Sequence, residues 1–184
     1  MNDFSRLAAL MAISASSWAC LVTPALAGEL PADVAAKVEK AKKRLVELAA
    51  DPTVLAAVRD ANSHSAAGMN NGKWIELGDN DPAVKNTLSS KVSLQIAKWE
   101  QSDDTVNKIV LRDQKGNLVG ASTRPLIFNN ANRPVFSQAI KGQPWAASEI
   151  KPDTSTQVPS VHVAAPVVDG GKTIGVLHAG VTAK

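Results

Sequence analysis

Apolar residues recur at alternating spacings of four and three positions after Pro31, and this pattern predicts an amphipathic helix. The apolar stripe consists of Val34, Val38, Ala41, Leu45 and Leu48. Lysine and glutamate side chains occupy the opposite face, as expected for a helix that packs one side against a core. Asp51-Pro52 interrupts the stripe, because aspartate is a favoured N-cap and proline is accepted at the first helical position. We therefore expect a second helix after this pair, nearly collinear with the first.

The same aspartate–proline pair recurs at Asp81-Pro82 and predicts a further helix that runs to about Trp99. Between these helical stretches, Asn70-Asn71-Gly72 is typical of a loop. The N-terminal half of the chain is therefore expected to be helical.

After Asp104 the apolar pattern changes to that of strands, which we expect at residues 108–113, 118–123, 145–150, 160–168 and 173–181. A short helix over Asn130 to Lys141, ended by Gly142, is expected between the second and third strands. Asp169-Gly170-Gly171-Lys172 predicts a tight hairpin turn, because glycine supplies the positive φ that such turns need. This order predicts one α+β domain built on a five-stranded antiparallel sheet, with the long N-terminal helix packed on one face.

The first residues have the features of a secretory signal peptide. Arg6 precedes an apolar run from Leu7 to Val22, and Ala25-Leu26-Ala27 fits a signal peptidase site. We expect residues 1–27 to be removed and the domain to span residues 28–184. The protein is then expected in the periplasm, exported through the Sec pathway.

Two alternatives for this segment stay open. The apolar run could be a membrane anchor, although it is short for a span of about 20 residues. Cys20 could be lipidated, although Ser17 stands where a lipoprotein signal usually has leucine. Cys20 is the one cysteine of the chain, so a processed protein would contain no disulfide and no cysteine-ligated metal.

Charge and motifs exclude several functions. The formal net charge is +3, and no lysine- or arginine-dense run with interleaved aromatic residues is present, so a nucleic-acid partner is not expected. There is no Gly-x-Ser-x-Gly elbow, no His-Glu-x-x-His pair and no phosphate-binding loop. Three scattered histidines do not form a recognisable metal site. We expect no catalytic residues, no metal and no cofactor, and the protein is not expected to be an enzyme.

Several short stretches carry a family resemblance. They are Asp113-x-x-Gly116-Asn117-Leu118-Val119, Asn132-Arg133-Pro134-x-Phe136-x-x-Ala139-x-x-Gly142, Ala165-Pro166-Val167 and Ile174-Gly175-Val176. In order and spacing they resemble the extracytoplasmic Cache (PAS-like) sensor domains, which bind ligands in bacterial chemoreceptors and sensor kinases. The resemblance runs from about Leu30 to Thr182. It implies a pocket on the sheet face away from the long helix, under the loop and short helix between the second and third strands.

The resemblance also implies partners. A small-molecule ligand is expected, and so is a membrane sensor kinase or chemoreceptor, because we expect the chain to lack its own transmembrane and output modules. A homodimer through the N-terminal helix is left open. In similar dicarboxylate and citrate sensors, an arginine lies near the position of His162 and an aromatic residue near that of Ala164. Both are replaced here, so a different ligand is expected.

Six residues are the candidate ligand contacts: Ser122, Arg124, Arg133, Trp145, Ser160 and His162. Alternation along the second strand places Gly120, Ser122 and Arg124 on one face of that strand. Along the fourth strand it places Ser160, His162 and Ala164 together, opposite the intervening apolar residues. Arginine pairs with carboxylates in a bidentate manner, so an organic acid or an amino acid is the expected ligand.

Each candidate also has a structural interpretation. Arg124 could be solvated, Arg133 could brace its loop, Trp145 could be part of the core, and His162 could be a structural histidine. Phe136 is expected in the core.

Two other function classes remain. The first is a protein-interaction module whose pocket is filled by its own side chains. The second is a secreted enzyme with an unrecognised site, for which His162 with Asp153 or Glu149 is the one plausible titratable pair. An open cavity would argue against the first alternative. A perturbed titratable pair in a cleft would favour the second.

Overall fold

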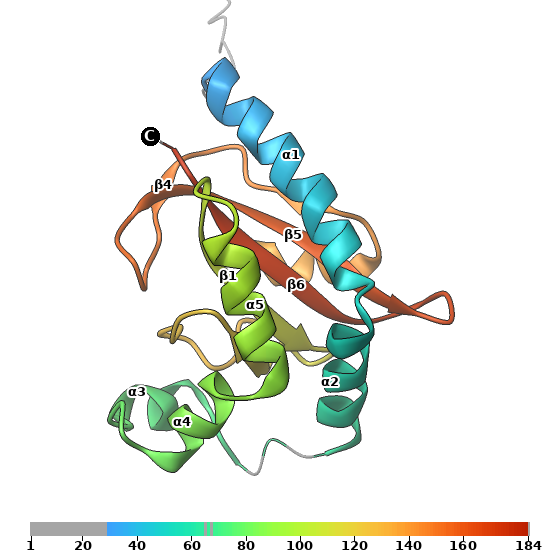
Figure 1. Ribbon diagram of the computed structural model, residues 1–184, viewed down its shortest axis with the longest axis vertical. Helices are drawn as coiled ribbons and strands as arrows, with labels where there is room; N and C mark the ends of the chain where they lie inside the picture. Colours follow the sequence, from blue (N-terminus) through green and yellow to red (C-terminus); the bar gives the residue numbers. More distant parts are fainter. Residues whose placement is uncertain (1–28, 65, 67, 184) are drawn as a thin grey trace, which may run out of the picture.

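A computed structural model describes residues 29–64, 66 and 68–183, and Figure 1 shows its ribbon. The predicted signal peptide and its cleavage site lie outside the described residues. Within the described part, none of the helices combines the length and the apolar character that crossing a membrane requires.

The N-terminal half is helical, as predicted. Its helices are α1 (Ala32–Ala49), α2 (Pro52–Ser63), α3 (Asn71–Glu76), α4 (Pro82–Leu88) and α5 (Lys91–Gln101). Asp51 accepts a hydrogen bond from the backbone N–H of Thr53 at 2.7 Å, and Asp81 accepts one from Ala83 at 2.8 Å. Both aspartate–proline helix starts are therefore confirmed.

Two helical predictions were wrong in detail. The helix expected from Asp81 to Trp99 is divided into α4 and α5, because Ser90 begins a new helix and accepts a hydrogen bond from the N–H of Ser93. The expected loop at Asn70-Asn71-Gly72 is the start of α3, because the Asn70 side chain accepts from the N–H of Lys73 at 3.0 Å. In both cases a polar side chain satisfies an N–H group of the first helical turn.

The sheet is antiparallel and more divided than expected. Its strands are β1 (Val106–Asp113), β2 (Leu118–Ala121), β3 (Trp145–Ala146), β4 (Lys151–Pro152), β5 (Pro159–Asp169) and β6 (Lys172–Thr182). Five of them follow the order β2-β1-β6-β5-β3, and β4 also pairs with β5, so the described residues form six strands rather than five. The strand expected at residues 145–150 keeps only its first two residues, because the chain leaves β5 before β4 returns to it.

The β5–β6 turn is formed as predicted. Gly170 and Gly171 have φ values of 55° and 80°, the left-handed region in which glycine carries no steric penalty. This hairpin gives the sheet its two longest strands, which run side by side through its centre (Figure 1).

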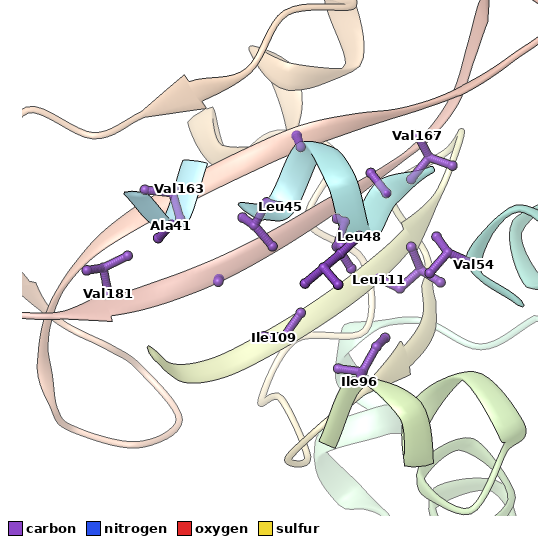
Figure 2. Close-up of a cluster of buried hydrophobic side chains, with 14 of the residues drawn as sticks. Ala41, Leu45, Leu48, Val54, Ile96, Ile109, Leu111, Val163, Val167 and Val181 are labelled. Atoms are coloured by element: carbon purple, nitrogen blue, oxygen red, sulfur yellow. The ribbon is translucent and has the colours of Figure 1, made fainter. Parts of the chain in front are cut away.

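The two faces of the sheet have different roles. On one face, α1, α2 and α5 pack on apolar strand residues, and Figure 2 shows Leu45, Val54 and Ile96 of these helices in one cluster with Ile109 and Val163 of the strands. Strand side chains alternate between faces, so the intervening residues of β1, β5 and β6 point to the opposite side. These residues are Lys108, Val110, Arg112, Ser160, His162 and His178.

The segment between β2 and β3 covers this second face. It contains the short helix α6 (Pro134–Ser137) and the 3₁₀ helix η1 (Ala139–Lys141). Gly142 ends it with a φ of 97°, which confirms the predicted glycine stop, but the helix expected from Asn130 begins only at Pro134 and is divided into an α and a 3₁₀ part. Phe136 is 4% exposed and packs in this layer, so its predicted core position is confirmed.

Candidate ligand-binding site

A cavity of about 250 Å³ lies on the sheet face away from α1. Its floor is formed by β1, β5 and β6, and its walls by residues 125–135 and 145–155. This is the place where the family resemblance implies a ligand. This volume lies near the lower end of the range of small-molecule pockets.

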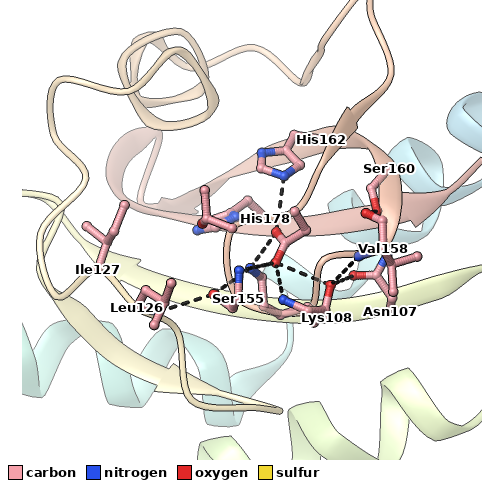
Figure 3. Close-up of polar contacts among 12 residues, drawn as sticks. Asn107, Lys108, Leu126, Ile127, Ser155, Val158, Ser160, His162 and His178 are labelled. Carbon is pink, nitrogen blue, oxygen red and sulfur yellow. Dashed lines mark hydrogen bonds and ion pairs between the residues drawn. The ribbon is translucent and has the colours of Figure 1, made fainter. Parts of the chain in front are cut away.

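One side of the cavity is formed by a buried ion pair. Lys108 on β1 donates to both carboxylate oxygens of Asp153, at 2.6 Å and 2.5 Å, and their side chains are 6% and 0% exposed. His162 on β5 reaches the same carboxylate, with Nε2 at 3.2 Å from Oδ2. Figure 3 shows Lys108 and His162 on opposite sides of this network. The pair thereby fastens the loop between β4 and β5 to the sheet.

Backbone groups complete the environment of Asp153. Its Oδ1 accepts hydrogen bonds from the N–H groups of Ser155 at 2.9 Å and Thr156 at 3.0 Å. Burial alone would raise the pKa of Asp153, but its contacts with His162 and Lys108 outweigh burial and hold that pKa well below the usual carboxyl range. Asp153 is therefore ionised at neutral pH, and both of its carboxylate oxygens already accept hydrogen bonds.

The deepest part of the cavity is formed by Arg112, His178 and Asn130. Arg112 is 2% exposed, and its Nη1 and Nη2 donate to the backbone carbonyls of Phe128, at 2.5 Å, and Ile127, at 3.0 Å. Its Nε donates to Nε2 of His178 at 3.4 Å. Among the described residues no carboxylate lies within ion-pair distance of this guanidinium.

Burial and neighbouring charges lower the pKa values of Arg112 and His178 at the cavity floor. Burial lowers the pKa of Arg112 to about 9, and the nearby Asp113 only partly offsets this. Burial also lowers the pKa of His178 well below its ordinary value, and the positive charges of Arg112 and Lys108 lower it further. His178 is therefore neutral at pH 7, while Arg112 remains a cation.

Four of the six predicted contact residues line the cavity. Ser160 and His162 lie on β5, Trp145 on β3, and Arg133 immediately before α6 at the exposed rim. The Ser160 hydroxyl accepts from Asn107 at 2.7 Å and donates to the carbonyl of Val158 at 2.8 Å. Both of its hydrogen bonds inside the protein are therefore already made.

Ser122 lies outside the cavity. The Ser122 hydroxyl bonds to the backbone N–H of Ile109 at 2.9 Å. Gly120 faces α5, since a Cβ there would lie 2.8 Å from Oγ of Ser93. The expected pocket-facing side of β2 is thus the helix-facing side, because Gly120 pairs with Leu111, whose side chain packs in the core under the helices.

Arg124 also lies outside the cavity. Arg124 binds Asp79 at 2.5 Å and the carbonyls of Trp74 and Leu77 at 2.8 Å each, and it stacks over the Trp74 ring. It ties the loop after β2 to α3.

Three buried polar residues of the site, Arg112, Lys108 and Asn130, were not among the candidates. Arg112 and Lys108 alternate with Ile109 and Leu111, so the sequence of β1 itself contains the signal for a polar face. Asn130 carries no comparable signal, because its place in the site depends on contacts with distant residues.

The geometry offers little for catalysis or metal binding. In residues 29–64, 66 and 68–183, no group of three or more His, Cys, Asp and Glu side chains could hold a metal ion. Asp153 and His162 do form a titratable pair, but Asp153 is enclosed and its oxygens are occupied. Glu149, the other acid considered, pairs with Lys151 at 2.5 Å.

Comparison with known proteins supports the fold. No protein-family model and no curated protein matches the chain. The sensor domain of the Vibrio cholerae histidine kinase DctB is similar, with a TM-score of 0.57 and 17% identity over 81% of this chain and 50% of that chain. The ligand-binding domain of the Campylobacter jejuni chemoreceptor Tlp3, in complex with L-valine, has a TM-score of 0.44 and 14% identity, over 84% and 65% of the two chains. The Escherichia coli DcuS sensor domain has a TM-score of 0.43 and 17% identity, over 72% and 92%.

Of these three, the DctB sensor domain is the one with a TM-score above 0.5. The chain spans about half of that domain's length. At 17% identity the likeness concerns the fold: a long N-terminal helix packed on an antiparallel sheet, as in Cache-type sensor domains. The predicted α+β fold class is thereby confirmed.

Proposed function

We propose that this chain is a periplasmic ligand-binding module of a sensory system, and that its ligand is a small carboxylate held by Arg112 and Arg133. The observation that carries the proposal is the buried guanidinium of Arg112 at the cavity floor. Buried charges in proteins are normally paired with an opposite charge, and this one meets only carbonyls and a neutral imidazole. Three of its five N–H donors are used, which leaves donors for a ligand.

The other cations of the cavity have their own partners or lie at its mouth. Lys108 is paired with Asp153, and Lys151 with Glu149. Arg133 is exposed at the rim, and its guanidinium makes no hydrogen bond or ion pair among the described residues. Two guanidiniums, one deep and one at the entrance, therefore remain to receive an anion. Planar guanidinium groups favour carboxylates, which organic acids and amino acids both carry.

The cavity itself weighs against the alternative of a protein-interaction module with a collapsed pocket. That alternative expects side chains to fill the space under α6, whereas a volume of about 250 Å³ lies there. Small-molecule sites typically combine apolar walls with a few convergent polar groups. Trp145, Val135 and Ile127 provide such walls around Arg112 and Arg133.

The test is a thermal-shift screen of organic acids and amino acids against their primary amides, followed by calorimetry of the hits. A ligand at one hundred times its Kd should add about 2.7 kcal/mol to stability. Arg133→Ala should weaken the best carboxylate about tenfold, because it removes a charged hydrogen bond, without changing Tm in the absence of ligand. Arg44→Ala, an exposed arginine on α1, is the matched control and should leave affinity unchanged.

Failure of every carboxylate to bind the folded protein would refute the proposal. Equal binding of acids and amides would also do so, since the guanidiniums would then contribute nothing to recognition.

Export and signalling are the further parts of the proposal. The apolar segment before Gly28 and the similarity to a histidine kinase sensor domain support them. Intact mass measurement of protein from the periplasm should give a chain that begins at Gly28; a chain that begins at Met1 or a lipidated Cys20 would contradict cleavage after Ala27. A photo-crosslinker at the exposed Lys43 of α1 should capture a membrane sensor kinase or chemoreceptor in a ligand-dependent way. Capture of a second copy of this chain would instead show the homodimer.

A further inference from the structure

Asn130 lines the cavity and has an unpaired, buried side-chain acceptor. The residue is 5% exposed and lines the cavity beside Arg112 and His178. Its Nδ2 lies 3.4 Å from Nε2 of His178. Its Oδ1 has no hydrogen-bond partner, and it is the one buried side-chain N or O atom in the described part of the chain for which this is true. Such atoms are rare in folded proteins and call for an explanation.

The neighbouring groups fix which way the Asn130 amide points. Arg112 donates from Nε to Nε2 of His178, so this ring nitrogen is an acceptor. The N–H groups of Arg112 and Asn130 can both point at the lone pair of this nitrogen. The amide oxygen of Asn130, placed there instead, would face another acceptor. The amide N–H₂ of Asn130 therefore faces His178, and turning the amide over would not rescue Oδ1. The acceptor is left unpaired by the network around it.

The partner of Oδ1 is expected to be an uncharged donor. An ammonium group at this point would lie close to Arg112, for which no described side chain supplies a carboxylate partner, so that the ligand's own carboxylate would be its counter-charge. Lys108 adds to the positive field, and the Asp153 charge that could favour an ammonium is already occupied by Lys108 and the turn N–H groups. A hydroxyl or an amide N–H has the required hydrogen without the charge.

We propose that the ligand bears a hydroxyl or an amide N–H beside its carboxylate, that this group donates to Asn130 Oδ1, and that hydroxy acids and carboxamide acids are preferred over amino acids. This inference rests on the proposed function, because Arg112 and Arg133 hold the carboxylate that brings the donor to Asn130. It assigns a specificity role to a residue that the sequence did not mark.

The test uses sets of acids that differ at one carbon. On a propionate and on a succinate skeleton, the second or third carbon carries hydrogen, hydroxyl or ammonium; the propionate set comprises propionate, lactate, 3-hydroxypropionate, alanine and β-alanine. Calorimetry on the unmodified protein should give the best hydroxy acid at least about a tenfold lower Kd than its hydrogen counterpart, since the unsatisfied acceptor penalises the analogue that lacks a donor. The ammonium counterpart should bind more weakly than the hydroxy acid by at least about tenfold.

A variant separates Asn130 from the rest of the pocket. Asn130→Leu keeps a similar volume and removes the acceptor, so it should abolish the preference for hydroxyl over hydrogen while the hydrogen-bearing acid still binds. Circular dichroism confirms that the variant is folded, and the ligand series on the unmodified protein needs no variant.

The outcomes separate the two proposals. Equal affinities for hydrogen- and hydroxyl-bearing acids would show that Oδ1 is satisfied by water, and would overturn the inference while the carboxylate site stands. Tighter binding of the amino acids would overturn it in the same way. If no acid of either skeleton and no other carboxylate binds, the proposed function and this inference both fall.

Discussion

The buried ion pair between Lys108 and Asp153 permits a quantitative prediction. Both side chains are more than nine-tenths buried, so removing one partner leaves the other charge without compensation in a poorly solvated site. Lys108→Met, which keeps the length of the side chain, should therefore lower the free energy of unfolding by about 3–5 kcal/mol. Asp153→Asn should cost a similar amount, because it leaves the Lys108 ammonium buried.

A double-mutant cycle isolates the pair. In the double variant no uncompensated charge remains, so its destabilisation should be smaller than the sum of the single losses by at least about 2 kcal/mol. Urea unfolding followed by circular dichroism measures each free energy, with the m-value as a check that the transition keeps its character. A loss below about 1 kcal/mol for Lys108→Met, or additive losses in the cycle, would refute the description of this pair as buried and coupled.

The pair also predicts a pH dependence. The pKa of Asp153 is held below its unfolded value of about 3.9, so its contribution to stability is present above about pH 4 and is lost as the pH falls below that value. In Lys108→Met, one of the groups that lowers this pKa is gone and the opposing effect of burial remains. The variant should therefore lose less stability between pH 7 and pH 3 than the unmodified protein, because the acid-dependent loss is proportional to the difference between the unfolded and folded pKa of Asp153. Superimposable acid profiles, measured by urea midpoints between pH 7 and pH 3, would contradict this.

Two further predictions concern packing. Gly175→Ala should destabilise the protein by about 1–3 kcal/mol, because the new Cβ would lie within 3 Å of the backbone carbonyl oxygen of Arg112, whereas Gly78→Ala meets open space and serves as the neutral control in thermal unfolding. Trp74→Phe should cost about 1–3 kcal/mol, since it removes the 2.7 Å hydrogen bond from Nε1 to the buried carbonyl of Pro125; an unchanged urea midpoint would show that this bond contributes nothing.

Much of the fold could be predicted because its signals are local. The apolar stripe of α1 and the glycine pair of the Gly170-Gly171 turn are each recognised from a short stretch of sequence. The division between α4 and α5 was missed because the sequence alone does not distinguish a serine inside a helix from a serine that caps one. The structure shows that Ser90 is a cap, since its hydroxyl accepts from the N–H of Ser93. The shortened β3 was missed because the departure of the chain from β5 depends on tertiary pairing rather than on strand propensity.

The site was predictable in part, for a related reason. His162 lies on the cavity side of β5, as alternation along the strand predicts, whereas the sequence left Trp145 between a core and a rim position. The position of Arg124 was not predicted, because it follows β2, where alternation no longer applies. Its guanidinium instead binds Asp79, in the turn between α3 and α4. The unpaired oxygen of Asn130 is created by His178, 48 positions along the chain, and no local pattern contains that contact.

The central claim is that Arg112 and Arg133 hold a carboxylate, and nitrogen-15 NMR of the arginine side chains tests it most directly. The Nε–H resonances of Arg112, Arg133 and Arg124 can be assigned by single substitutions and followed while the best carboxylate from the calorimetric screen is added. The account predicts saturable shifts of Arg112 and Arg133 with the calorimetric Kd, and no shift of Arg124, whose partners lie outside the cavity. A saturating titration in which Arg112 and Arg133 do not move would contradict it.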